Sequence, residues 1–126
     1  MVFREVHLMS EASYHGSCQC QAVIFDATLD LDHTVTCNCS RCQRLGSVLS
    51  FTPTEKFRLA QGEDSLTEYL FNTKKIRHQF CKVCGVEPFA YGALPDGTPI
   101  VAVNVNCLES VDPRALKSTH YDGRSL

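Results

Sequence analysis

Seven of the eight cysteines fall into three short groups, at spacings typical of metal sites or disulfides. The groups are Cys18 and Cys20; Cys37, Cys39 and Cys42; and Cys81 and Cys84. Arg4 and Glu5 stand where an export signal needs its apolar region. We therefore expect the protein to stay in a reducing compartment, the cytoplasm. In such a compartment, cysteine clusters are more often metal ligands than disulfides. The groups therefore predict metal binding, and zinc suits them better than an iron–sulfur cluster.

The spacing within each group predicts how its sulfurs converge. In a Cys-x-Cys pair on an extended backbone, both side chains leave the same face of the chain. In Cys81-x-x-Cys84 the chain must bend, and Gly85 gives the backbone the freedom that this bend needs. We therefore expect two ligands from each pair and three from the central group.

Four plus three ligands make one closed zinc site and one open zinc site. A structural zinc takes four protein ligands, whereas a catalytic zinc keeps three and leaves a position for water or substrate. The two pairs, Cys18/Cys20 and Cys81/Cys84, combine into the closed site, which leaves Cys37, Cys39 and Cys42 as the open one. Two readings of Cys107 remain: it is a buried free thiol, or it closes the second site and makes the protein a non-catalytic scaffold.

Short strands must position these cysteines. Apolar residues alternate at period two in residues 21–30, where Val23, Phe25, Ala27 and Leu29 share a face. Further strands are expected at 35–39, 47–51 (ended by Pro53), 65–71 and 76–80, and a hairpin at 91–105 turns at Pro95-Asp96-Gly97. Helical turns are expected at 40–45 and after Asp112. The sequence predicts a mainly β fold with one or two short helices, in a single domain covering residues 1–126.

Composition excludes several classes of function. The formal net charge is −2, and 21% of the residues are charged, so no basic surface attracts nucleic acid or an anionic membrane. No apolar run approaches the length of a membrane span. We expect a small-molecule partner, with the oligomeric state left open, a homodimer included.

The ordered groups resemble the glutathione-dependent formaldehyde-activating enzyme family, in the form of its short bacterial members. The resemblance rests on Gly16-Ser-Cys18-Gln-Cys20, Cys37-Asn-Cys39-Ser-Arg-Cys42, Phe80-Cys81-Lys-Val-Cys84-Gly85 and Tyr121-Asp122-Gly123-Arg124, and it extends from about Tyr14 to the C-terminus. It implies a β-tent fold, a structural zinc at Cys18, Cys20, Cys81 and Cys84, and a catalytic zinc at Cys37, Cys39 and Cys42. It also implies carbon–sulfur lyase activity on S-hydroxymethylglutathione.

A zinc ion bound by three thiolates is a weak activator of water, because the site already carries a net charge of about −1. Such a zinc suits the capture of a substrate thiolate, glutathione or another small thiol. His78 and Tyr91 are candidates for the accompanying proton transfer. Arg41 and Arg44 flank Cys42 and are candidate anchors for a substrate carboxylate, although solvent-facing surface charge explains them equally well.

Overall fold

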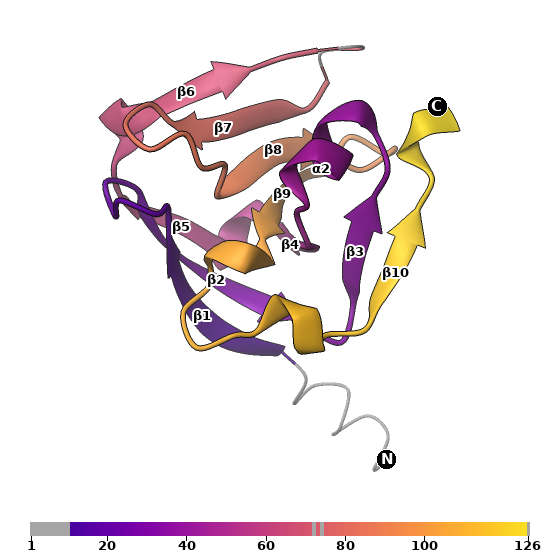
Figure 1. Cartoon of the computed structure of the whole chain (residues 1–126), viewed down its shortest axis with the longest axis horizontal. Helices are drawn as coiled ribbons and strands as arrows, with labels where there is room; N and C mark the ends of the chain where they lie inside the picture. The colour runs from indigo at the N-terminus through magenta and orange to yellow at the C-terminus, as the bar shows by residue number, and fades with distance from the viewer. Residues whose placement is uncertain (1–10, 72, 74, 126) are drawn as a thin grey trace.

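Two β-sheets form the framework of the protein in a computed structural model, which describes residues 11–71, 73 and 75–125 (Figure 1). The smaller sheet has the strand order β1-β2-β5 and the larger one the order β10-β3-β4-β9-β8-β7-β6. The strands are β1 (Glu11–Ser17), β2 (Ile24–Asp30), β3 (Thr34–Cys37), β4 (Leu49–Pro53), β5 (Phe57–Gln61), β6 (Leu66–Tyr69), β7 (Arg77–Cys81), β8 (Phe89–Ala93), β9 (Pro99–Asn104) and β10 (Ser118–Tyr121).

Helical structure is confined to short segments in the described residues. The α-helix is α2 (Ser40–Leu45), and the 3-10 turns are η1 (Thr54–Lys56), η2 (Glu63–Ser65), η3 (Val105–Cys107), η4 (Pro113–Ala115) and η5 (Gly123–Ser125). The predicted mainly β fold with few short helices is thus confirmed. No helix in the described ranges is long and apolar enough to cross a bilayer.

The alternation in residues 21–30 produces the predicted strand, β2, with one buried face. Phe25, Ala27 and Leu29 of β2 are buried, while the residues between them are half-buried. Phe25 stacks on Phe57 at a ring-centroid distance of 5.6 Å, and Phe57 meets the edge of Phe89 at 4.7 Å. These aromatic rings come from both sheets, so the core lies between them.

The predicted hairpin and both helical turns are also present. β8 pairs with β9 in antiparallel register, Ala93 opposite Pro99, and the Gly97 N–H donates to the Leu94 carbonyl within the turn. The Asp112 side chain accepts the N–H of Arg114 at the start of η4. α2 begins and ends at the predicted residues: the Cys39 side chain caps its start by accepting the Cys42 N–H, and Gly46 takes the left-handed conformation that stops it.

Candidate metal centres and the adjoining pocket

The first cysteine group has the geometry of a tetrahedral metal site. The sulfurs of Cys18, Cys20, Cys81 and Cys84 all lie within 4.8 Å of one another. Cys20 Sγ lies 3.8 Å from Cys18 Sγ and 3.7 Å from Cys81 Sγ. A tetrahedron with metal–sulfur bonds of about 2.3 Å has sulfur–sulfur edges of about 3.8 Å. The donor set and its spacing therefore fit zinc.

Two tight turns, one from each sheet, bring these four sulfurs together. β1 ends at Ser17, and the chain then turns back, with the Gln21 N–H donating to the Cys18 carbonyl at 3.2 Å and Gln21 at a φ of 66°. The expectation that Cys18 and Cys20 converge on an extended backbone is therefore wrong. The second turn follows the prediction, since Gly85 has a φ of 82° and its N–H donates to the Cys81 carbonyl at 2.8 Å.

The second group gathers the sulfurs of Cys37, Cys39 and Cys42 within 4.8 Å of one another. Cys37 ends β3, Cys39 is the N-cap of α2, and Cys42 lies in the helix. The strand expected at 35–39 therefore ends at Cys37, and Cys39 lies outside it. Among residues 11–71, 73 and 75–125, the group contains these three potential ligands and no fourth Cys, His, Asp or Glu.

Backbone amides and neighbouring sulfurs set the charge state of this group. Burial alone would raise the pKa of Cys39, but the N–H groups of Cys42 and Arg41 hold it below its usual value. Burial and the adjacent Cys39 raise the pKa of Cys42 to about 12. Three thiolates at this distance repel one another, so their joint ionisation needs a cation, and a thiophilic metal ion fits that demand.

Cys107 lies outside both groups. Burial raises its pKa to about 12, with further contributions from the charges of Cys18 and Cys84. Its charged neighbours are Cys18 and Cys84 of the four-cysteine group and Glu87, and the three-cysteine group does not include Cys107. Cys107 is half-buried, so of the two readings a free thiol that is partly buried is the one that agrees with this placement.

His78 and Arg41 are joined by a residue that the sequence reasoning missed. Glu87 Oε2 lies 2.8 Å from His78 Nδ1, and Glu87 Oε1 accepts the Arg41 Nε–H at 2.9 Å and the Nη2–H at 2.7 Å. The side chains of His78 and Glu87 are only 6% and 9% exposed, and Nε2 of His78 has no hydrogen-bond partner among the described residues. Glu87 is 46 positions from Arg41, so no local spacing indicates the contact.

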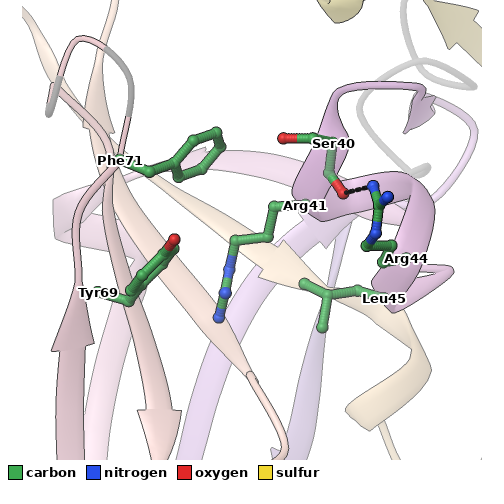
Figure 2. A pocket seen from close by; sticks show the side chains of 6 residues that line it. All are labelled: Ser40, Arg41, Arg44, Leu45, Tyr69 and Phe71. Atoms are coloured by element: carbon green, nitrogen blue, oxygen red, sulfur yellow. Dashed lines mark hydrogen bonds between the residues drawn. The ribbon is translucent and has the colours of Figure 1, made fainter.

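A pocket of about 430 Å³ adjoins this network and lies between α2 and the end of β6. Figure 2 shows its wall, formed by Ser40, Arg41, Arg44, Leu45, Tyr69 and Phe71. The Arg41 guanidinium lies over the Tyr69 ring at 4.5 Å, and Arg44 Nη1 donates to the Ser40 carbonyl at 2.9 Å. Cys39 and Cys42 flank Ser40 and Arg41 in the chain, so α2 supplies both the pocket wall and part of the metal centre.

The structure separates Tyr91 from this region. Tyr91 pairs with Arg77 and His78 pairs with Ala90, and adjacent residues of a strand point to opposite faces of the sheet. The Tyr91 ring packs on the Phe89 ring at a centroid distance of 5.3 Å, and the Arg77 guanidinium lies over its face. Burial is the main cause that raises the pKa of Tyr91. His78 instead shares a face with Tyr69 and stacks on Phe71 at 5.4 Å. Of the two candidates for proton transfer, the structure thus brings His78 to the arginine pocket.

Comparison with known proteins agrees with this arrangement of sites. The sequence model of the glutathione-dependent formaldehyde-activating enzyme family matches residues 13–121, a span that contains both cysteine groups. A crystal structure of a Rhodobacter sphaeroides protein, a structural-genomics target, superposes with a TM-score of 0.73 at 30% sequence identity. The alignment covers 83% of this chain and 99% of the Rhodobacter chain.

Proposed function

Because the chain belongs to the glutathione-dependent formaldehyde-activating enzyme family, we propose that it is a zinc-dependent carbon–sulfur lyase acting on adducts of formaldehyde with glutathione or another small thiol. The observation that carries the proposal is the three-cysteine group beside a pocket with two arginines. Cys18, Cys20, Cys81 and Cys84 would hold a structural zinc, and Cys37, Cys39 and Cys42 a catalytic one. The latter ion would supply a thiophilic centre that favours the ionised form of a substrate thiol.

The reaction makes or breaks one carbon–sulfur bond. In the forming direction, the thiolate sulfur attacks the formaldehyde carbon, the carbonyl electron pair moves to oxygen, and the oxygen takes up a proton. In the cleaving direction, the hydroxyl loses that proton, the carbonyl re-forms, and the thiolate leaves with the bonding pair. The protein must therefore stabilise a thiolate and move one proton.

We assign the proton transfer to His78. Glu87 accepts from Nδ1 when that nitrogen carries the hydrogen, which leaves Nε2 as the nitrogen that exchanges a proton. Phe71 stacks on the imidazole and lines the pocket, so the ring lies directly behind the pocket wall. Tyr91 stays a prediction, and Tyr91→Phe compared with His78→Gln separates the two candidates. We expect His78→Gln to lower kcat with little change in KM.

The two arginines differ as carboxylate anchors. Arg41 is ion-paired with Glu87 and covers the Tyr69 ring, so its charge is already partly compensated. Arg44 donates to a neutral carbonyl and retains its charge for a substrate. We therefore propose Arg44 as the main contact to a thiol that carries a carboxylate, with Arg41 shaping the wall. Their positive charge also offsets the negative metal centre.

Substrate comparison tests this assignment. Arg44→Gln should raise KM for glutathione by about tenfold, the loss of a charged hydrogen bond, and leave KM for 2-mercaptoethanol unchanged because that thiol has no carboxylate. Arg58→Gln is the matched control, since Arg58 lies in β5 and pairs with Asp26. Equal effects of Arg44→Gln on both thiols would remove Arg44 as an anchor.

The activity itself is tested by exchange. Carbon-13 formaldehyde mixed with a thiol interconverts with its adduct, and NMR exchange spectroscopy measures the rate. We expect the zinc-loaded protein to accelerate this exchange and Cys42→Ser to abolish the acceleration. Cys107→Ala should keep it, because Cys107 lies outside both groups. An equal rate with and without the protein, for every thiol tried, would contradict the proposed function.

A further inference from the structure

The chain that follows β10 is fastened to the three-cysteine group. β10 runs parallel to β3, with Tyr121 opposite Cys37, and the Asn38 N–H extends the ladder by donating to the Tyr121 carbonyl at 3.2 Å. Figure 1 shows this segment beside β3 and close to α2. The segment thus reaches the group along the same strand that supplies Cys37.

Asn38, the residue between Cys37 and Cys39, is held at both ends of its side-chain amide. Its Nδ2 donates to Asp122 Oδ1 at 3.0 Å, and its Oδ1 accepts the backbone N–H of Arg124 at 2.9 Å. A third link goes to the helix, where Arg124 Nη2 donates to Gln43 Oε1 at 2.8 Å, next to Cys42. Residues 121–125 therefore contact the residue between Cys37 and Cys39 and the residue that follows Cys42.

Gly123 lies against the sulfur of Cys37. A Cβ placed on Gly123 would be 2.6 Å from Cys37 Sγ and 3.4 Å from Cys39 Cβ. Non-bonded heavy atoms of this kind prefer separations of about 3.5–4.0 Å, so only a residue without a side chain fits. A larger residue would displace either the 121–125 segment or the sulfur.

We propose that residues 121–125, here called the 121–125 clamp, position the ligands of the three-cysteine centre. The inference rests on the proposed function, because it concerns how that centre holds its metal. A metal site needs its ligands within about 0.5 Å of the productive geometry, and the partners that orient them set the affinity. The clamp fixes the Cys37-Asn38-Cys39 turn through Asn38. Gly123 has no side chain, so it lies against Cys37 Sγ without displacing it.

Two variants test the clamp without replacing a cysteine of the three-cysteine centre. Gly123→Ala adds a methyl group against Cys37 Sγ, and Asp122→Ala removes the carboxylate that holds Asn38 while adding no atoms. Gly92→Ala is the matched control, since a Cβ at Gly92 meets nothing within 4 Å. The measurement is the release of zinc or cobalt from the full chain to a chelator. Cys42→Ser identifies the release phase that belongs to the three-cysteine centre.

We expect both clamp variants to release metal from the three-cysteine centre about 10–100-fold more readily, with the four-cysteine centre unchanged. Release equal to that of Gly92→Ala would overturn the clamp, and so would an equal loss from both centres, which would indicate a general effect on folding. A wild-type chain that binds a single metal ion would instead overturn the proposed function. The two failures are therefore distinguishable.

Discussion

Glu87 shows how much of the site depends on single long-range contacts. Its carboxylate forms an ion pair with Arg41 and a hydrogen bond with His78, and its side chain is only 9% exposed. The two cysteine pairs and the three-cysteine group could be predicted because the spacing within each is local. The contacts of Glu87 with Arg41, of Asn38 with Asp122 and of Gly123 with Cys37 could not, because the partners lie 46, 84 and 86 positions apart and only the folded sheets bring them together.

Removing the charge of Glu87 should destabilise the protein strongly. Glu87→Gln keeps the shape but leaves Arg41 uncompensated and largely buried, so we expect the free energy of unfolding to fall by about 3 kcal/mol. Glu68→Gln is the control, because the Glu68–Arg77 pair is half exposed and should contribute less than about 1 kcal/mol. Urea denaturation of both variants measures the difference. Equal losses would mean that burial of the Glu87 pair has no special effect.

His15 and Asp26 form a pair whose titration is measurable. Their side chains lie 2.6 Å apart on β1 and β2; Asp26 raises the pKa of His15, and His15 lowers the pKa of Asp26. Because the pKa of His15 is raised by folding, its contribution to stability is complete below the unfolded value of about 6.5 and is lost as the pH rises through the folded value. The contribution of Asp26 is lost at the acidic end, as the pH falls through its lowered pKa.

Asp26→Asn should therefore return the His15 pKa toward its ordinary value and reduce the fall in stability that accompanies a rise in pH from about 6.5 through the folded pKa. A histidine NMR titration measures the pKa directly, and thermal unfolding at several pH values follows the stability. Asp96→Asn, in the β8–β9 turn, should leave His15 unchanged. A His15 pKa that does not respond to Asp26→Asn would contradict the pairing.

At the scale of elements, sheet position explains which strands the sequence missed, although β6, at an edge of the larger sheet, was expected within residues 65–71. The alternation of β2 and the β8–β9 hairpin are visible in the sequence because one face of these strands is buried. The missed strands β1, β5 and β10 all lie at sheet edges, and their residues are mostly exposed or half-buried. An edge strand needs one partner and little apolar surface, so it leaves a weak pattern.

α2 depends on its terminal glycine. Gly46 has a φ of 66°, and its N–H donates to the Cys42 carbonyl at 2.9 Å. A Cβ there would meet nothing within 4 Å, so Gly46→Ala tests backbone conformation alone and should cost about 1 kcal/mol of unfolding free energy. Gly46→Asn should cost less, because Asn tolerates this conformation. Chemical denaturation distinguishes them, and equal stabilities of Ala and Asn variants would contradict the argument.

At the scale of the whole molecule, the four-cysteine group ties the two sheets together. Cys18 and Cys20 follow β1 of the smaller sheet, Cys81 ends β7 of the larger one, and Cys84 lies in the turn after β7. A metal ion bound by these four sulfurs would cross-link two layers that otherwise meet through the core. The two sheets explain why the four cysteines come from turns that lie far apart in the chain.

Loss of that cross-link should weaken the whole fold. Cys84→Ser should lower the zinc content from about two ions to one and reduce the thermal midpoint by about 10 °C or more. Cys42→Ser should also remove one ion but change the midpoint far less, since its group lies within the larger sheet and α2. Mass spectrometry counts the metal, and calorimetry follows unfolding. Similar midpoints for the two variants would contradict the division of roles.

The span of the four-cysteine group also has a consequence for biosynthesis. Cys20 and Cys81 are 61 positions apart, and a ribosome adding about 5–20 residues per second needs about 3–12 s to cover that distance. During that interval the first two thiols exist without the second two. The nascent chain can therefore complete this centre only after most of both sheets has been translated, so metal insertion there would be a late event in the maturation of the protein.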